Sequence, residues 1–165
     1  MTTRRITTAD LPEFLQLIDA VERDSEYMLM EPGERDFQSE EEKISKILNL
    51  PNCVIIAAEM DHKLAGYIMG LGGQAVRNRH SVYLVAGVLK EYRGRGIGTQ
   101  LFDSVESWAV SKNIHRLELT TAVKNTSAVH LYKKAGFEIE GIKKDSLKIN
   151  QSFIDEYYMC KIIQS

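Results

Sequence analysis

The sequence predicts an α/β protein with a mixed central sheet, and three observations support this fold class. Two apolar runs, Val54–Met60 and Leu64–Leu71, are separated only by the polar Asp61–Lys63, as expected for a β-hairpin. The apolar run Val82–Leu89 precedes an amphipathic segment that reaches about Asn113, the pattern of a strand followed by a helix. A hairpin that leads into alternating strands and helices is typical of α/β proteins with a mixed sheet.

Length and composition indicate an ordinary globular protein. The chain has 165 residues, of which 44% are apolar and 27% charged, so we expect a single domain over residues 1–165. The net charge of −2 gives no reason to expect nucleic acid or an anionic membrane as a partner. The N-terminus has no apolar signal core and no run approaches a membrane span, which predicts a cytoplasmic protein.

The two cysteines do not predict a metal site. Cys53 and Cys160 are far apart in the chain and match no spacing of metal ligands. Both lie in apolar stretches, so we expect both to be buried as small apolar side chains, and we expect no bound metal.

The N-terminal segment predicts an edge strand and a helix. Arg4–Thr7 is the strand candidate. Asp10, Pro12 and Glu13 together are typical of a helix N-terminus, with Asp10 as the cap. The apolar residues that follow recur at helical spacing and are expected to be buried: Leu11, Phe14, Leu15, Ile18 and Val21.

A loop and a second helix follow. Glu31–Glu34 contains adjacent Pro and Gly residues, which break the first helix. Ser39 and Glu42 have the spacing of a capping box, so we expect a helix over Glu40–Leu48.

The C-terminal part predicts three more strands around a short helix. Leu117–Thr121 has the pattern of a strand, and Thr126–Ala135 that of a helix stopped by the next glycine. Phe137–Ile142 and Ile154–Ile163 are the last two predicted strands. The polar, lysine-rich stretch Lys143–Gln151 is expected to connect them.

A glycine-rich turn after Val82–Leu89 predicts a phosphate site. Its glycines occupy alternate positions: Gly94, Gly96 and Gly98. Without Cβ atoms, the backbone N–H groups of the turn can approach a ligand closely. The helix that follows adds unsatisfied N–H donors and a partial positive charge of about half a unit. Arg93 and Arg95 add two full charges, so Arg93–Thr99 is expected to bind a phosphate group.

The spacing of this turn separates three kinds of phosphate site. A dinucleotide fingerprint would have its third glycine at the position of Thr99, although Glu118 lies at about the distance of a ribose-binding acid. A P-loop would have a lysine between its last glycine and Thr99, and none is present. The pattern R-x-x-G-x-G at Arg93, Gly96 and Gly98 fits, and it resembles the acetyl-CoA pyrophosphate loop of the GCN5-related N-acetyltransferase (GNAT) family.

A second motif supports the resemblance. The family carries a strand, an asparagine, an alanine, a Leu-Tyr pair and a Gly-Phe pair. This sequence has the same residue types at the same spacing: Asn125, Ala128, Leu131, Tyr132, Gly136 and Phe137. The resemblance covers roughly Ile6–Ile163 and is strong over Ser81–Ile142.

The resemblance implies a GNAT-type fold and an acetyl-CoA-dependent N-acetyltransferase. Such a fold has a mostly antiparallel sheet with helices on both faces, and a splayed strand pair leaves a gap for the pantetheine arm. The acetyl group would pass directly to a primary amine, without a metal or a covalent enzyme intermediate. The residues expected to bind acetyl-CoA are Gly87, Val88, Leu89, Arg93, Gly94, Arg95, Gly96, Ile97, Gly98, Thr99, Asn125 and Tyr132.

The resemblance also gives Tyr132 a chemical role, as the acid that protonates the leaving thiolate. A phenol with a pKa near 10 can do this only if a dry site raises the basicity of the thiolate. The base is open, because Thr120 occupies the position where several family members carry a carboxylate. Glu118 lies on the same strand face and would act through a water. Packing for Tyr132 and a solvated strand face for Glu118 are the alternatives.

The resemblance places the acceptor pocket between the loop after the first helix, the central strand and the last strands. Glu31 and Tyr83 are the candidate contacts to a small-molecule amine or amino acid. A protein N-terminus, as in ribosomal-protein acetylation, is the alternative acceptor. A CoA-binding module without transferase activity is the alternative function. The sequence is compatible with a homodimer.

Overall fold

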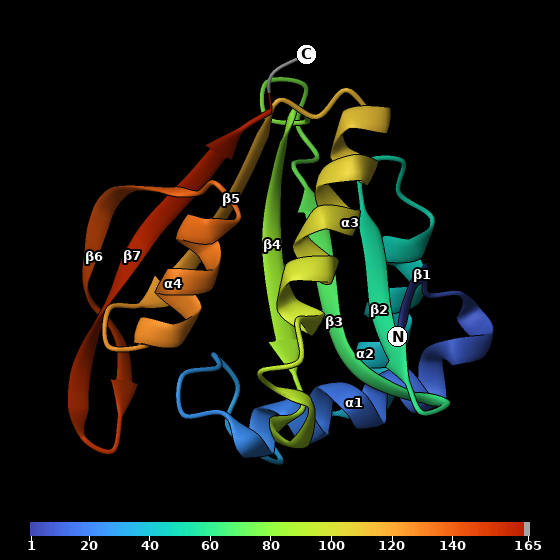
Figure 1. The fold of residues 1–165 in the computed structure, drawn as a ribbon, viewed down its shortest axis with the longest axis horizontal. Coiled ribbons are helices and arrows are strands. Elements are labelled where there is room, and N and C mark those ends of the chain that lie inside the picture. Colours follow the sequence, from blue (N-terminus) through green and yellow to red (C-terminus); the bar gives the residue numbers. More distant parts are fainter. Residues whose placement is uncertain (164–165) are drawn as a thin grey trace.

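The computed structural model describes residues 1–163 and has a seven-stranded sheet with helices on both faces (Figure 1). The strands are β1 (Thr2–Arg5), β2 (Val54–Met60), β3 (Lys63–Gly72), β4 (Ser81–Val88), β5 (Arg116–Ala122), β6 (Glu138–Ile149) and β7 (Ser152–Ile162). The helices are α1 (Leu11–Asp24), α2 (Phe37–Leu48), α3 (Ile97–Ser111) and α4 (Thr126–Lys134), with 3-10 turns η1 (Thr8–Asp10) and η2 (Lys90–Tyr92). The strand order is β1-β2-β3-β4-β5-β7-β6, and every neighbouring pair except β4–β5 is antiparallel. The predicted α/β class with a mixed, mostly antiparallel sheet is confirmed.

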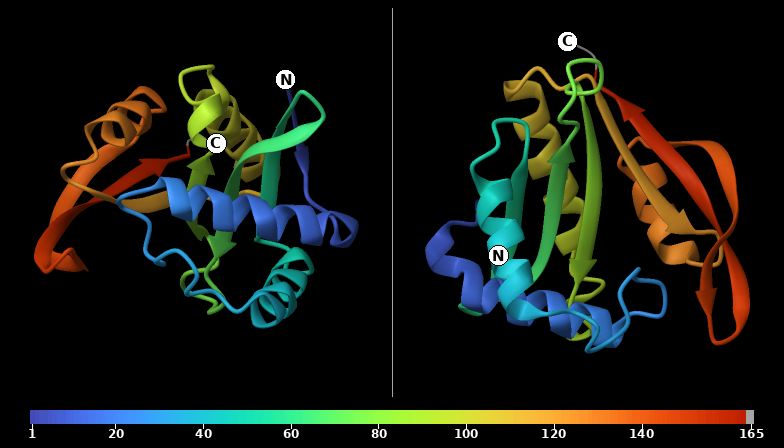
Figure 2. Two further views of the ribbon diagram at one scale, coloured as in Figure 1. Left: turned by 90° about the horizontal axis from the view of Figure 1, so that it is seen from below. Right: turned by 180° about the vertical axis from the view of Figure 1, so that it is seen from behind.

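Two apolar cores lie on the two faces of the sheet. Figure 2 shows α1 and α2 on one face and α3 and α4 on the other. Side chains alternate along a strand, so β2 sends Ile56 to the core with α3 and sends Ile55 and Ala57 to the core with α1. The apolar stripe expected for the first helix is buried in α1: Leu11, Phe14, Leu15, Ile18 and Val21.

The predicted hairpin forms from β2 and β3, with a shorter turn than expected. Lys63 already pairs with Met60, so only Asp61 and His62 lie in the turn. Both have positive φ angles, 53° and 61°, as a two-residue hairpin turn with the right-handed twist of its strands requires.

The N-terminal strand and helix cap differ from the sequence prediction. The strand covers Thr2–Arg5 and not Arg4–Thr7. Thr7 is the N-cap residue of η1 and forms a capping box with Asp10, so it does not belong to the strand. Asp10 Oδ2 accepts hydrogen bonds from Thr7 N at 2.8 Å and Thr7 Oγ1 at 3.0 Å. Asp10 therefore occupies the predicted N-cap position of α1, but its side chain closes the preceding turn and makes no capping hydrogen bond to the helix.

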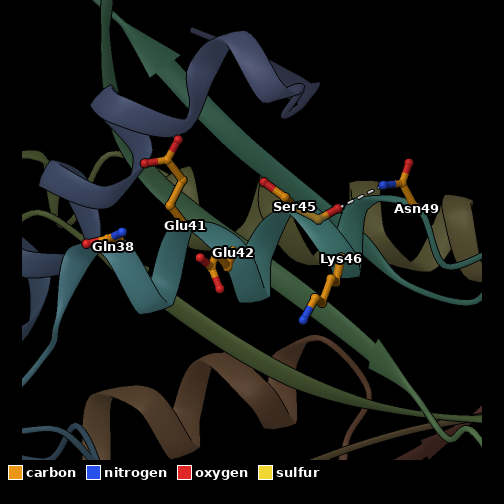
Figure 3. A pocket seen from close by; sticks show the side chains of 6 residues that line it. All are labelled: Gln38, Glu41, Glu42, Ser45, Lys46 and Asn49. Carbon is orange, nitrogen blue, oxygen red and sulfur yellow. Dashed lines mark hydrogen bonds between the residues drawn. The ribbon is translucent and has the colours of Figure 1, made fainter.

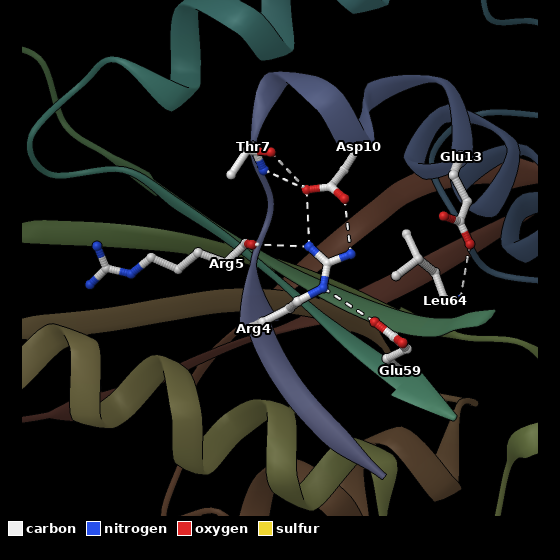
Figure 4. Close-up of polar contacts among 7 residues, drawn as sticks. All are labelled: Arg4, Arg5, Thr7, Asp10, Glu13, Glu59 and Leu64. Carbon is white, nitrogen blue, oxygen red and sulfur yellow. Dashed lines mark hydrogen bonds and ion pairs between the residues drawn. The ribbon is translucent and has the colours of Figure 1, made fainter. Parts of the chain in front are cut away.

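Arg4 joins β1 to β2 and to this turn (Figure 4). Its guanidinium donates to both carboxylate oxygens of Asp10, at 2.9 and 3.0 Å, and to Glu59 at 3.2 Å. Hydrogen bonds from Arg4 and from the Thr7 backbone lower the pKa of Asp10 from 3.8 to about 2. The ionised form of Asp10 is thus the form that stabilises the fold.

We expect Asp10→Asn to lower the melting temperature at neutral pH by a few degrees. A folded-state pKa below the unfolded value contributes stability that is present above pH 3.8 and is lost as the pH falls towards about 2. The difference between the two proteins should therefore shrink through this pH range in thermal denaturation followed by circular dichroism. An equal difference at all pH values would assign the effect to packing.

Helix α2 begins earlier than predicted. It starts at Phe37 after the N-cap residue Asp36, and the predicted capping box of Ser39 and Glu42 does not form. Arg35, which directly precedes this cap, donates to Glu40 in the first turn at 2.7 Å. The ion pair joins the residue before the N-cap to the first turn of α2. Ser39 therefore lies inside the helix and not at its N-cap position.

Strands β6 and β7 are longer than predicted. β6 runs through the lysine-rich stretch to Ile149, and only Asn150 and Gln151 form the turn, with φ angles of 49° and 64°. β6 is an edge strand, and lysines on an edge strand remain solvated while the backbone pairs with β7. Polar composition therefore does not exclude a strand here.

Both cysteines are free thiols that are partly exposed, and the expectation that they are buried is wrong. The Cys53 sulfur accepts a hydrogen bond from the backbone N–H of Gly72 at 3.3 Å. Cys160 pairs across the sheet with Glu118, on a polar strand face.

Candidate functional site

The central feature is a gap between β4 and β5. Their parallel pairing joins only Ser81–Tyr83 to Arg116–Glu118, although β4 continues to Val88 and β5 to Ala122. Figure 1 shows the two strands diverging beyond this short contact. The splayed strand pair implied by the resemblance is therefore present.

The backbone of β4 presents polar groups to this gap. Gly73 N donates to Ser81 O at 3.0 Å, and Leu89 N donates to Ala65 O at 2.9 Å. Backbone groups alternate in direction along a strand, so the odd-numbered residues of β4 bond to β3 and the even-numbered residues face β5. Beyond the paired segment, the residues that face the gap are Leu84, Ala86 and Val88. Their N–H groups form a row of donors beside the gap.

The glycine turn continues from the end of this row. Gly94 and Gly96 have φ angles of 74° and 81°, which favour glycine, and no atom lies within 4 Å of a Cβ placed on either. Helix α3 begins directly after Gly96, so its first N–H groups, which have no partner within the helix, lie beside this open space. Gly98 differs, because its Cβ would lie 2.8 Å from Leu131 of α4. The first two glycines therefore form the open turn, and the third allows close helix packing.

The two arginines of the turn are exposed. Arg93 Nε donates to Val88 O at 3.1 Å, which links the turn to the gap edge of β4. The Arg95 guanidinium lies 5.4 Å from the centre of the Tyr92 ring and donates to the Met60 sulfur at 3.7 Å. An anion at the turn would meet an open backbone, a helix N-terminus and two flanking positive charges.

Tyr132 lies in α4 and Asn125 directly precedes that helix, on the other side of the gap. Asn125 caps α4, its Oδ1 accepting from Ala128 N at 3.4 Å. The Tyr132 ring packs against Phe102 of α3 with 5.3 Å between the centroids. Burial, together with the nearby phenol of Tyr83, raises the pKa of Tyr132 to about 12. Tyr132 therefore keeps its proton at neutral pH and can donate it.

Tyr83 and Thr120 form a bridge where the gap begins. Their hydroxyl oxygens lie 2.7 Å apart, between β4 and β5. The predicted contact residue Tyr83 thus lies where the gap begins, with its hydroxyl hydrogen-bonded to that of Thr120.

Glu118, the predicted base, is already engaged. Its carboxylate accepts a hydrogen bond from Arg116 Nε at 2.7 Å, and Arg116 also pairs with Glu140. Because Arg116 lies between two carboxylates, the Glu118 side chain takes part in a polar network on the strand face. Its geometry therefore favours the alternative of a solvated strand face.

The remaining predicted residues are spread around the gap. Glu31 is exposed in the loop between α1 and α2, which lies beside the diverging ends of β4 and β5 (Figure 2). Gly87 and Leu89 direct their backbone to β3, so they do not line the gap edge as Val88 does. A Cβ on Gly87 would lie 2.4 Å from Val21 and 3.2 Å from Tyr67, so packing requires a glycine there.

Two buried polar side chains near the gap are absent from the residues predicted from sequence. Glu22, at the end of α1, is 2% exposed, and Tyr67, on β3, is 0% exposed. Both occur in apolar patterns that predict core positions. The sequence signal that could have indicated these two residues is Gly87. A glycine inside a strand of larger residues indicates that a neighbouring side chain approaches the backbone closely.

A second concave surface lies on the outer side of α2 (Figure 3). This hollow of about 480 Å³ is lined by Gln38, Glu41, Glu42, Ser45, Lys46 and Asn49. Five of these residues belong to α2 and Asn49 is its C-cap, and none of the six belongs to the gap between β4 and β5. It is the face of a solvated helix.

Residues 1–163 contain neither a cluster of metal ligands nor a helix that could span a membrane. Within residues 1–163, no group of three or more His, Cys, Asp or Glu side chains is arranged to hold a metal ion. No helix in the same residues combines the length and apolar character needed to cross a membrane.

Comparison with known proteins finds acetyltransferases. The family described as Acetyltransferase (GNAT) family matches residues 15–137. L-amino acid N-acetyltransferase AaaT of Escherichia coli (strain K12) is 27% identical over 121 residues, which cover 71% of this chain and 73% of that protein. A GNAT-family acetyltransferase structure from Streptococcus pneumoniae has a TM-score of 0.91 and 28% identity, covering 99% of both chains. A ribosomal-protein-alanine N-acetyltransferase structure from Brucella melitensis has a TM-score of 0.86 and 25% identity, covering 98% of this chain and 99% of that one.

Proposed function

Because the chain belongs to the acetyltransferase (GNAT) family, we propose that it transfers an acetyl group from acetyl-CoA to the primary amine of a small molecule, such as an amino acid. Family membership confirms the predicted class, an acyltransferase with acetyl-CoA as donor. The observation that carries the proposal is the pair of donor sites at one opening: the gap-facing N–H groups of Leu84, Ala86 and Val88, and the glycine turn at the start of α3. One extended ligand with a phosphate end fits these two sites.

Different residues bind different parts of acetyl-CoA. The turn Arg93–Thr99 and the start of α3 bind the pyrophosphate, and Asn125 contacts the pantetheine arm from α4. The Val88 N–H points into the gap and polarises the thioester carbonyl, because a donor fixed there stabilises the charge that develops on oxygen. Tyr132 protonates the thiolate as it leaves.

The geometry supports this order of groups. Arg93 joins Val88 to the turn through a bond of 3.1 Å, so the carbonyl and phosphate sites are held at a fixed separation. Tyr132 keeps its proton because its pKa lies at about 12. A neutral amine that is held beside the thioester needs no covalent enzyme intermediate.

The acceptor enters from the side of the loop between α1 and α2. Glu31, Glu34 and Asp36 lie exposed in this loop and would attract a cationic amine. The similarity to an amino acid N-acetyltransferase favours an amino acid. The similarity to a ribosomal-protein-alanine N-acetyltransferase makes an N-terminal alanine the second candidate.

An acceptor screen tests the proposal. Purified protein is incubated with acetyl-CoA and single acceptors, namely L-amino acids, diamines and a peptide with an N-terminal alanine, and the free thiol is measured. We expect release above background with one class of small amine. Release with the peptide alone would favour the second candidate. Binding of CoA without release for any amine would indicate a module that only binds CoA.

A further inference from the structure

Tyr67 carries a buried hydroxyl that has no hydrogen-bond partner among residues 1–163. The side chain belongs to β3, and its ring packs edge-on against Phe14 of α1 with 5.5 Å between the centroids. A buried hydroxyl without a partner is unfavourable, so folded proteins rarely retain one without a reason. A ligand group that enters the protein can provide the missing partner.

The hydroxyl points from β3 towards the gap. Tyr67 pairs with Gly87 of β4, and its ring crosses over that glycine, with Cε1 at 3.2 Å and Cζ at 3.5 Å from a Cβ placed there. The oxygen on Cζ lies still further from β3. Burial raises the pKa of Tyr67, and Glu22 and Tyr132 raise it further. Tyr132 belongs to α4, so the hydroxyl lies between α1 and the acid on the far side of the gap.

Glu22 is the carboxylate on the α1 side. It follows Val21, whose side chain would meet a Cβ on Gly87 at 2.4 Å, so this turn of α1 lies against β4. Glu22 Oε1 accepts a hydrogen bond from Arg35 Nε at 2.6 Å, which leaves Oε2 for a second donor. Glu22 is therefore a buried carboxylate with one oxygen engaged.

The charges around Glu22 favour its use as a base. The groups that face it are Asp19 on α1, Arg35 in the loop, Glu40 on α2 and the Tyr67 phenol on β3. Burial raises the pKa of Glu22 and outweighs the opposing effect of Arg35, with smaller contributions from the two acids. A carboxylate with a raised pKa accepts a proton more readily at neutral pH.

We propose that Tyr67 and Glu22 form the proton-accepting pair for the acceptor amine, with Tyr67 contacting the amine and Glu22 receiving the proton through it. The inference rests on the proposed acetyl transfer. The Tyr67 oxygen accepts an N–H from the ammonium group, and its own O–H donates through one water to Glu22 Oε2. Because the Tyr67 hydroxyl is buried, the acceptor can reach it only when the side chains that line the gap change conformation.

The protons and bonds balance along this route. One ammonium proton passes to the Tyr67 oxygen as the Tyr67 proton passes to Glu22, which later releases it to solvent. The neutral amine forms a C–N bond to the thioester carbon, and the C–S bond breaks. The second proton that nitrogen loses reaches the sulfur through Tyr132. Tyr67 and Tyr132 thus act on opposite sides of the reacting carbon.

The pH dependence of kcat/KM tests the pair, measured with two acceptors whose amine pKa values differ by about a unit or more. In the wild type, Glu22 sets the acid-side inflection, so the inflection should be the same for both acceptors. In Glu22→Gln, kcat/KM at neutral pH should fall about 10- to 1,000-fold. Its inflection should then follow the pKa of each acceptor, because only the free amine reacts.

Glu40→Gln is the matched control. Glu40 accepts from Arg35 at 2.7 Å, as Glu22 does at 2.6 Å, so its replacement loosens the same loop anchor while leaving Tyr67 and Glu22 in place. The pH profile of Glu40→Gln should keep its inflection. Tyr67→Phe should lose activity as Glu22→Gln does, with an equal or higher melting temperature, because the unpartnered hydroxyl is gone. The double variant should lose no more than either single one.

Three results would overturn the pair. An unchanged inflection in Glu22→Gln, an equal shift in Glu40→Gln, or full activity in Tyr67→Phe would each exclude it while acetyl transfer by the wild type stands. If Glu118→Gln moves the inflection instead, Glu118 is the base. A wild type that acetylates no amine at all contradicts the proposed function itself, and the pair with it.

Discussion

Gly96→Asp is expected to weaken acetyl-CoA binding strongly. The residue has a φ angle of 81° and borders open space at the start of α3, where the pyrophosphate is proposed to lie. An aspartate there would fill this space and place a negative charge beside a negative ligand. Two like charges about 4 Å apart repel by roughly 1–4 kcal/mol at the effective dielectric constants of a protein surface. Isothermal titration calorimetry with CoA should show a loss of affinity of at least about 10-fold, and up to about 1,000-fold.

Gly33→Asp is a matched control for backbone strain. Gly33 has a φ angle of 82° and likewise no atom within 4 Å of a placed Cβ, but it lies in the loop between α1 and α2. Its replacement introduces the same residue in the same conformation, so CoA affinity should be retained. Undiminished affinity in Gly96→Asp, or tighter binding of NAD than of CoA by the wild type, would contradict the assignment of the turn.

The parts of the site that the sequence predicts are local in the chain. The glycine turn is such a part, because Arg93–Thr99 holds its glycines and charges within one segment and the next helix provides the N–H donors. The cap at Asn125 is another, since its partner is Ala128 in the next turn. Spacing along the chain therefore contains most of the information about the turn and about α4.

The parts that the sequence does not predict depend on contacts between distant segments. Tyr67 has the pattern of an ordinary core residue of β3, and only its register with Gly87 shows that its ring crosses to the gap. Glu22 lies on the apolar side of α1, and its partner Arg35 belongs to the following loop. Strand register and loop path are tertiary properties, so composition and periodicity do not reveal this pair.

Local signals also failed where tertiary contacts offered a better partner. Asp10 has the sequence context of a helix cap, but Arg4 and Thr7 bind its carboxylate instead. Ser39 and Glu42 have capping-box spacing, but the ion pair of Arg35 with Glu40 accompanies an earlier helix start. Propensity is a weak signal whenever a charged partner from another element is within reach.

Tyr132→Phe is expected to keep CoA affinity within a few-fold and to lower turnover by about 10- to 1,000-fold. The substitution retains the ring, whose centroid lies 5.3 Å from that of Phe102, and removes only the proton donor. The melting temperature should therefore hardly change. Single-turnover measurements of thiol release, under conditions where chemistry limits the rate, separate this effect from slower product release.

The pH dependence of turnover is a second test of the role of Tyr132. The protonated phenol is the active form, and its pKa of about 12 means that the wild type should lose no activity through this group at any pH where the protein is normally assayed. An alkaline decline near pH 10 that vanishes in Tyr132→Phe would contradict the burial of this phenol in the working enzyme. Tyr83→Phe is a companion variant, because it removes the phenol that adds to the raised pKa of Tyr132 and leaves the Tyr132 hydroxyl in place. If Tyr132→Phe turns over as fast as the wild type, then Tyr132 serves packing alone and the thiolate takes its proton from solvent.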